Sequence, residues 1–120
     1  MNNYKGLIVY QKSYNLALDV YKLSADFPQE ERFGLTSQMK RASTSIPLNI
    51  AEGYGKRNNG REYSRFLMMA IGSCDEIRVL LDFCKDLGFM SDENYHSLYA
   101  GYDEVGKMLN SLHKSWENPN

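Results

Sequence analysis

The sequence predicts an all-α fold, namely an antiparallel up-down-up-down four-helix bundle. Apolar residues recur at intervals of three and four positions along four segments, the spacing of one face of an α-helix, and no segment shows the alternation of a strand. The connections between segments are roughly three to eight residues long, which favours antiparallel neighbours. A chain of 120 residues can bury a core without disulfides or metal, so we expect one domain, 1–120, with its core at about 9–116.

The first predicted helix begins near Tyr10, ends at about Phe27 and is stopped by Pro28. Five residues, spaced by four, three, four and three positions, are expected to form its buried stripe. They are Tyr10, Tyr14, Ala17, Tyr21 and Ser24.

The second predicted helix begins near Thr36, whose hydroxyl is expected to cap it, and ends at Gly53 and Gly55. Its buried stripe consists of Met39, Ala42, Ile46, Ile50 and Gly53.

Pro47 lies inside this second helix, where it has no N–H to donate to the carbonyl of Ser43. We expect a kink there, at a cost of about 3 kcal/mol unless neighbouring groups compensate. The hydroxyls of Ser43, Thr44 and Ser45 are the expected compensation. The bend either wraps the helix around the core or shapes a binding surface.

The third predicted helix extends from Asn59 to Leu87, with Asn59 and Glu62 as a capping box and Gly88 as its stop. Its buried stripe is Tyr63, Leu67, Ala70, Cys74, Ile77, Leu81 and Cys84. The fourth predicted helix is capped by Ser91. Its stripe is Tyr95, Leu98, Tyr102, Val105, Leu109, Leu112 and Trp116.

The cysteines indicate a reducing compartment. Cys74 and Cys84 are ten positions apart on one predicted helix, which separates them by about 15 Å along its axis, too far for a disulfide. We expect both to be reduced core residues of a cytoplasmic protein. The first residues do not resemble a secretory signal and no apolar run is long enough to cross a bilayer, so neither secretion nor membrane association is expected.

Positive charge is concentrated between Arg32 and Arg65. This stretch has seven Lys and Arg residues against Glu52 and Glu62, whereas the rest of the chain has seven basic and thirteen acidic residues. Such an asymmetry points to an anionic partner even though the formal net charge is −1.

The turn from Lys56 to Arg61 combines cations, amide side chains and glycine, which suits contacts to phosphate. Tyr54 and Tyr63 flank it and could stack on bases, although Tyr63 also belongs to the buried stripe. We therefore expect an anionic partner, for which nucleic acid is one candidate. The candidate phosphate-binding residues are Lys40, Arg41, Lys56, Arg57, Arg61 and Arg65.

A second apolar stripe on the third helix points away from the predicted core. It consists of Met68, Gly72, Val79 and Phe83. Small Gly72 between larger side chains would let another helix approach closely, so we favour a homo-oligomer interface, and the alternative is a broad core contact. Leu48, an apolar residue in the polar stripe of the second helix, is assigned to the same interface.

Signatures of catalysis are nearly absent. His96 and His113 are seventeen residues apart and lack the companions of a zinc site. Gly55 and Lys56 lack the leading glycine and the following Ser or Thr of a phosphate-binding P-loop. We expect no enzyme activity, no catalytic residues, no metal site and no cofactor.

Several blocks of the chain form a recognisable set. They are Val9-Tyr10-Gln11-Lys12-Ser13-Tyr14, Phe33-Gly34-Leu35-Thr36-Ser37-Gln38-Met39-Lys40-Arg41-Ala42, Ser45-Ile46-Pro47-Leu48-Asn49-Ile50-Ala51-Glu52-Gly53 and Glu62-Tyr63-Ser64-Arg65-Phe66-Leu67. From about Val9 to Leu112 the chain resembles the four-helix-bundle proteins of the 23S rRNA intervening-sequence family, some of which are labelled ribosomal proteins.

The resemblance implies an antiparallel four-helix bundle, bacterial and cytoplasmic, that assembles into a ring-like homopentamer. Similar bundles are accessory proteins of diversity-generating retroelements, in which a basic pentamer holds RNA and a reverse transcriptase. The leading hypothesis is an oligomeric nucleic-acid-binding accessory protein. The alternative is a non-enzymatic scaffold whose charged rim recruits an acidic protein partner such as a reverse transcriptase, and nuclease resistance of the co-purifying partner would distinguish the two.

Overall fold

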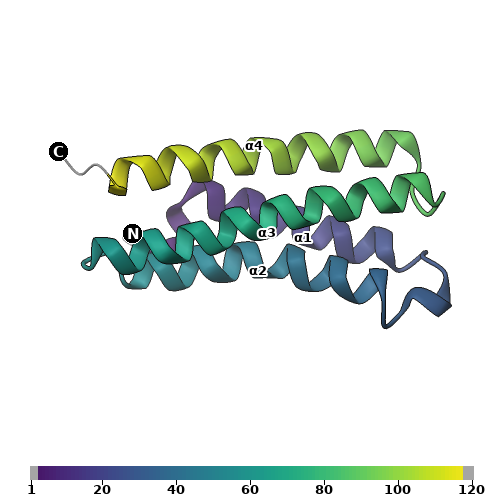
Figure 1. Cartoon of the computed structure of the whole chain (residues 1–120), viewed down its shortest axis with the longest axis horizontal. Coiled ribbons are helices and arrows are strands. Elements are labelled where there is room, and N and C mark those ends of the chain that lie inside the picture. The colour runs from purple at the N-terminus through teal and green to yellow at the C-terminus, as the bar shows by residue number, and fades with distance from the viewer. Residues whose placement is uncertain (1–2, 118–120) are drawn as a thin grey trace.

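Four long helices make up most of the structure, a computed structural model that describes residues 3–117. In chain order the elements are η1 (Tyr4–Gly6), α1 (Ile8–Ser24), η2 (Gln29–Glu31), α2 (Leu35–Gly55), α3 (Gly60–Asp86) and α4 (Asp92–Glu117). The described residues contain no strand. Successive α-helices run in opposite directions along a bundle of 48 × 23 × 21 Å (Figure 1). The all-α four-helix bundle is therefore confirmed.

Each α-helix contacts two neighbours, so the bundle has four sides. The contacting pairs are α1 with α2, α2 with α3, α3 with α4, and α4 with α1. The diagonal pairs, α1 with α3 and α2 with α4, make no contact within the described residues. Every helix consequently turns one face to the core and leaves an outward face that its own chain does not cover.

The predicted core stripes of α2 and α3 are confirmed. Met39, Ala42, Ile46 and Ile50 are buried, as are the seven predicted residues of α3. On α4, Leu98, Tyr102, Val105 and Leu109 are buried, and the remaining predicted residues pack against the cluster from its edge.

The predicted stripe of α1 is wrong at two tyrosines, because Tyr14 and Tyr21 are 48% and 44% exposed. The buried residues of α1 are Val9, Ser13, Ala17, Val20 and Ser24. Small side chains let α1 approach the core closely, and the buried serine hydroxyls are satisfied inside the helix. Ser13 Oγ donates to the Tyr10 carbonyl at 3.1 Å, and Ser24 Oγ donates to the Tyr21 carbonyl at 3.3 Å.

Asn59 and Ser91 cap their helices as predicted, whereas Thr36 does not. Asn59 Oδ1 accepts from the Glu62 backbone N–H at 3.2 Å and Ser91 Oγ from the Asn94 N–H at 3.1 Å. Thr36 is buried inside α2, whose N-cap is Gly34. The Glu31 carboxylate accepts from the N–H of Leu35, the first helical residue, at 3.3 Å.

The α2 helix continues through Pro47, which is buried. The hydroxyls of Ser43 and Thr44 do not provide the expected compensation for Pro47. Ser43 Oγ and Thr44 Oγ1 each donate to the Lys40 carbonyl at 3.0 Å. That carbonyl lies one turn before the Ser43 carbonyl that Pro47 cannot reach with an N–H. The Ser45 hydroxyl instead bonds to Ser73 across the α2–α3 contact.

Both cysteines are unpaired and buried, as predicted. Burial raises the pKa of Cys74 and of Cys84 to about 11 in each case. A thiol with such a pKa is almost fully protonated near neutral pH and therefore unreactive. In the part of the chain that the structure describes, no helix is long and apolar enough to cross a membrane.

Helix α2 packs tightly against α3 at Gly53, and this contact gives a test of the packing. An alanine Cβ at this position would lie 2.8 Å from Phe66 Cβ and 3.1 Å from Tyr63 Cδ1. We expect Gly53→Ala to lower the free energy of unfolding by about 1–3 kcal/mol, measured by urea denaturation. Gly55→Ala is the matched control, because a Cβ there meets nothing within 4 Å. Equal losses in the two variants would contradict this packing.

Candidate nucleic-acid interface

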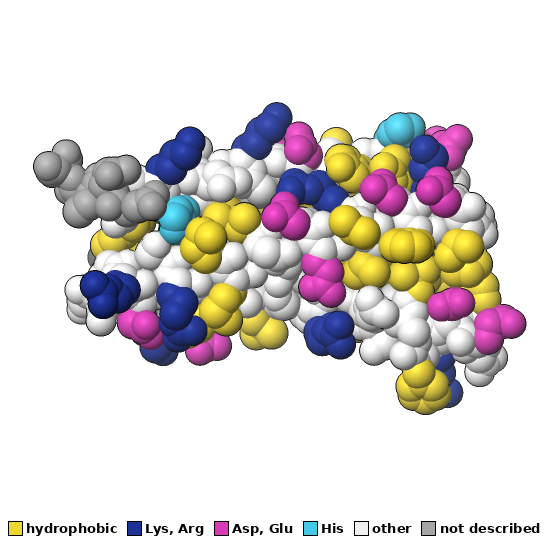
Figure 2. Space-filling model, in the orientation of Figure 1, with side chains coloured by type: hydrophobic (Ala, Val, Ile, Leu, Met, Phe, Trp, Pro, Cys, Tyr) yellow, Lys and Arg dark blue, Asp and Glu magenta, His cyan; other side chains and the backbone are white. Residues whose placement is uncertain are grey.

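Charge is segregated along the bundle. The half that contains the α2–α3 turn, residues 3–16, 46–73 and 105–117, has eight Lys and Arg and three Asp and Glu. The other half, residues 17–45 and 74–104, has six basic and twelve acidic residues. On the face shown in Figure 2, acidic side chains gather toward the end opposite the α2–α3 turn. The asymmetry in the sequence is thus a polarity in space.

The basic end, as we call the surface of Lys56, Arg57, Arg61 and Arg65, contains one arginine that is fixed by its own turn. Arg57 Nη1 donates to the Tyr54 carbonyl at 2.9 Å, and its guanidinium lies 4.1 Å from the centre of the Tyr54 ring. Arg57 thereby satisfies a carbonyl at the C-terminus of α2 and stacks on an aromatic face. Part of its bonding capacity is already used within the protein.

Lys56 and Arg65 lie on either side of the sequence turn but converge on Phe66. The Arg65 guanidinium is 4.5 Å and Lys56 Nζ 5.3 Å from the centre of the Phe66 ring. Arg65 also forms two hydrogen bonds of 3.2 Å with the Glu62 carboxylate. The hydrogen bond from Arg65 lowers the pKa of Glu62. Glu62 therefore competes with any phosphate for Arg65 and does not close the predicted capping box.

Arg61 is the most available cation of the basic end. It is exposed in the first turn of α3, beside Asn58 and Asn59, and it has no ion pair with any described residue. Lys56 is exposed as well. These two side chains can reach a phosphate without first breaking a contact to a carboxylate.

Lys40 and Arg41 do not join the other four predicted residues. They lie just under two turns before Pro47 on α2, about 22–24 Å from Lys56 along the helix axis. Lys40 Nζ sits 5.0 Å from the centre of the Tyr21 ring, and Arg41 Nη2 is 3.9 Å from a carboxylate oxygen of Glu76. Both belong to the acidic half of the bundle.

Sequence reasoning missed the contribution of α4 to the basic end. The Trp116 ring packs on Tyr63 with centres 4.8 Å apart, and it also lies against Gly60. The last turn of α4, including exposed Lys114, is therefore placed beside the α2–α3 turn. The predicted antiparallel topology could have revealed this contribution, because it brings the end of the fourth helix to the start of the third.

The predicted interface residues are exposed. Leu48 is 63%, Met68 52%, Val79 55% and Phe83 55% exposed, and a Cβ on Gly72 would meet nothing within 4 Å. The alternative of a broad core contact is thereby excluded within this chain. Val79 and Phe83 lie in the half of α3 over which hydrophobic side chains gather in Figure 2.

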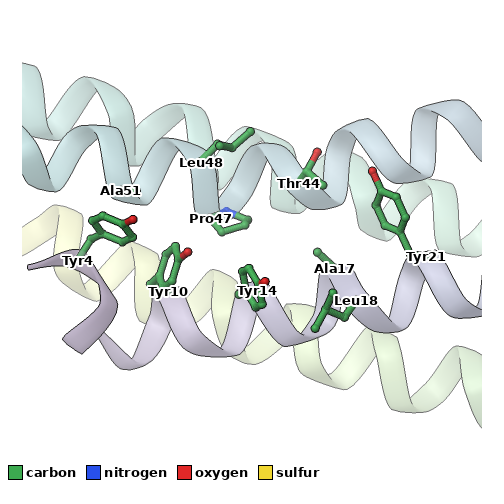
Figure 3. A pocket seen from close by; sticks show the side chains of 10 residues that line it. All are labelled: Tyr4, Tyr10, Tyr14, Ala17, Leu18, Tyr21, Thr44, Pro47, Leu48 and Ala51. Carbon is green, nitrogen blue, oxygen red and sulfur yellow. The ribbon is translucent and has the colours of Figure 1, made fainter.

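A groove between α1 and α2 holds the largest concentration of exposed tyrosines. It has a cavity volume of about 410 Å³. Its wall includes Tyr4, Tyr10, Tyr14, Leu18, Tyr21 and Leu48, and Pro47 lies at its base (Figure 3). Leu48 thus belongs to this groove, which sequence reasoning did not find because it placed the tyrosines of α1 in the core.

The fold and the segregated charge define a class of small helical bundles that present one basic end. The chain belongs to the 23S rRNA-intervening sequence protein family, whose model matches residues 5–111. A solved structure of a protein of unknown function from the S23 ribosomal protein family of Bacteroides thetaiotaomicron is 25% identical, with a TM-score of 0.81 over 89% of this chain and 96% of that one. No curated protein matches the chain.

The contacts of the basic end predict different roles for two neighbouring arginines. We expect Arg57→Ala to lower the free energy of unfolding by about 0.5–2 kcal/mol, because it removes a stacking contact and one of the donors to the Tyr54 carbonyl, which also accepts from the Arg57 backbone N–H. Arg61→Ala should change it by less than about 0.5 kcal/mol. Thermal or urea unfolding measures both. Arg57→Lys keeps the charge but not the planar stack, so full recovery of stability with lysine would contradict this role.

Proposed function

We propose that this protein is an oligomeric, non-enzymatic accessory protein that binds RNA through its basic end. The observation that carries the proposal is the segregation of charge, which leaves Lys56 and Arg61 exposed at one end of a bundle whose other end is acidic. Membership of a family named after an rRNA intervening sequence favours RNA as the anion.

The binding mode follows from the residues available. Arg61 and Lys56 supply direct phosphate contacts, and Arg57 offers the donors that its bond to Tyr54 leaves unused. Arg65 joins them when a phosphate displaces Glu62. Cations on a turn neutralise phosphates without reading base edges, so binding should be indifferent to sequence and strongly dependent on salt.

The acidic half of the bundle determines how RNA approaches. A phosphate backbone is repelled by the twelve carboxylates of that half and attracted by the basic end. RNA would therefore contact the bundle end-on rather than along its length, and Lys40 and Arg41 would contribute little to that contact.

Assembly would strengthen a small basic surface. We assign Leu48, Met68, Gly72, Val79 and Phe83 to contacts between copies, and the family resemblance implies a pentamer. Several basic ends on one rim would bind RNA with an avidity that one copy lacks. Protein partners such as a reverse transcriptase would join this assembly as a further step.

The absence of catalysis is part of the proposal. The strongest pKa shifts belong to Cys74, Cys84 and Tyr102, whose pKa values burial raises, and to Tyr95, whose pKa the hydrogen bond with Asp82 raises to about 12. The first three groups lie in the packed core, where no substrate could reach them, and Tyr95 lies on α4, outside the open groove. The reduced, buried thiols also favour a cytoplasmic location.

Removal of two cations tests the binding surface. We expect Lys56→Ala with Arg61→Ala to weaken binding to unrelated structured RNAs by the same factor and to reduce the salt slope by about two. Fluorescence anisotropy over a salt series measures both quantities. Lys22→Ala with Arg32→Ala removes the same charge from the acidic half and should have a much smaller effect. Equal losses in the two double variants would refute the assignment.

The assembly has its own test. Met68→Glu and Phe83→Glu each place a charge in the proposed contact, so each should convert the wild-type multimer into folded monomers. Size exclusion with light scattering gives the mass, and circular dichroism verifies the fold. Phe33→Glu is the control, because Phe33 is 88% exposed but lies in the α1–α2 connection. An unchanged mass for the α3 variants would remove this stripe from the interface.

A further inference from the structure

The molecule has two separate apolar surfaces that its own chain leaves uncovered. One is the α1–α2 groove, where Tyr14, Leu18 and Leu48 are between 45% and 63% exposed. The other is the outer stripe of α3, defined by Met68, Gly72, Val79 and Phe83. By contrast, the described part of α4 contributes no large exposed hydrophobic residue. Helices α1 and α3 are diagonal in the bundle, so the two surfaces lie on different sides of it.

We propose that the outer stripe of α3 in one copy docks into the α1–α2 groove of the next copy. This inference rests on the assembly that we propose above and specifies its geometry. A single helix presents a ridge of side chains, and two neighbouring helices enclose a groove, so the two surfaces are complementary in shape. The contact is head-to-tail, because each copy gives one surface and receives the other.

The two surfaces also match in level along the bundle. The hydrogen bond between Ser45 and Ser73 sets the middle of α2 beside the middle of α3. The α2 wall of the groove runs from Thr44 to Ala51, which is level with the part of α3 that carries Met68 and Gly72. In copies that run in the same direction, the groove therefore faces Met68 and Gly72, and the missing side chain of Gly72 permits close approach.

Charge favours this pairing over a parallel contact of two α3 stripes. In the acidic half, residues 74–104 on the α3 and α4 side carry eight acidic and two basic residues, whereas residues 17–45 on the α1 and α2 side carry four of each. Exposed Asp75, Glu76 and Asp82 flank the stripe. Lys40 stands on the groove side, over the Tyr21 ring, so docking brings a positive charge toward the acidic flanks of the stripe.

An antiparallel pair of stripes would avoid the repulsion but would leave the groove open to water. If one kind of contact is to cover both apolar surfaces of every copy, that contact must be head-to-tail. Because the two surfaces face different directions around the bundle, repetition of the contact turns steadily and can close into a ring. All copies then run in the same direction, which gathers their basic ends on one rim.

Two complementary variants test the head-to-tail contact. Leu18→Glu spoils the groove and leaves the α3 stripe intact, and Met68→Glu does the reverse. Each variant alone should be a folded monomer of 13.8 kDa. An equimolar mixture at high protein concentration should form a dimer of twice that mass and nothing larger, because one intact groove meets one intact stripe. Phe33→Glu should remain a wild-type multimer. Light scattering measures the masses.

Photo-crosslinking supplies an independent measurement. A benzophenone side chain in place of Tyr14, in an otherwise wild-type chain, should yield covalent species of at least twice the monomer mass. The crosslinked peptide should come from α3. Since α1 and α3 of one copy do not contact each other, such a crosslink reports a second copy.

Several results would overturn the inference. They are a mixture that stays monomeric without an α1–α3 crosslink, a Leu18→Glu variant that stays multimeric, and a wild-type protein that is monomeric. A multimeric Leu18→Glu variant that has lost RNA binding would assign the groove to nucleic acid instead. RNA binding by the wild type is measured separately, so a multimer that ignores RNA would refute the proposed function and leave this contact standing.

Discussion

The packing of Tyr63 fixes the end of the bundle on which the proposed function depends. Its ring is buried against α2 at Gly53, meets Tyr54 with centres 6.3 Å apart, and carries Trp116 of α4 at 4.8 Å. Three helices are thereby held together at the α2–α3 turn. Tyr54 in turn provides the ring and the carbonyl that hold Arg57. Core packing therefore fixes where the basic end lies. The exposed cations need no contacts of their own to keep them at that end of the bundle.

The sequence predicted the four helices and most of the core, because spacing by three and four residues is a property of the helix itself. It failed on α1, where pattern alone ranked Tyr14 and Tyr21 above Ser13 and Val20. The serines can be buried only because carbonyls of the same helix accept from their hydroxyls, a fact that depends on geometry. The tyrosines gain from a half-buried edge, where the ring is covered and the hydroxyl stays in water.

The candidate site was predictable as a group of charges but not as a surface. Lys40 and Arg41 belong to the same basic stretch of sequence as Lys56, yet helix α2 puts about 22–24 Å between them and that turn. Arg57 and Arg61 were indistinguishable as residues of a basic turn. Their difference arises because the chain leaves α2 at Lys56 and folds Arg57 back over Tyr54, which leaves Arg61 to begin α3 in solvent.

Small residues in the core of α1 connect the fold to its assembly. Ser13 and Ala17 draw α1 inward, and the large side chains that cannot follow, above all Tyr14 and Leu18, remain as one wall of the groove. The opposite wall is formed by α2 around Pro47, which is buried. A monomer gains no stability from such exposed apolar surface. Docking of a second copy buries this surface and stabilises the assembly. The relative direction of the two copies then decides whether the basic ends of the bundles are dispersed or collected on a single rim.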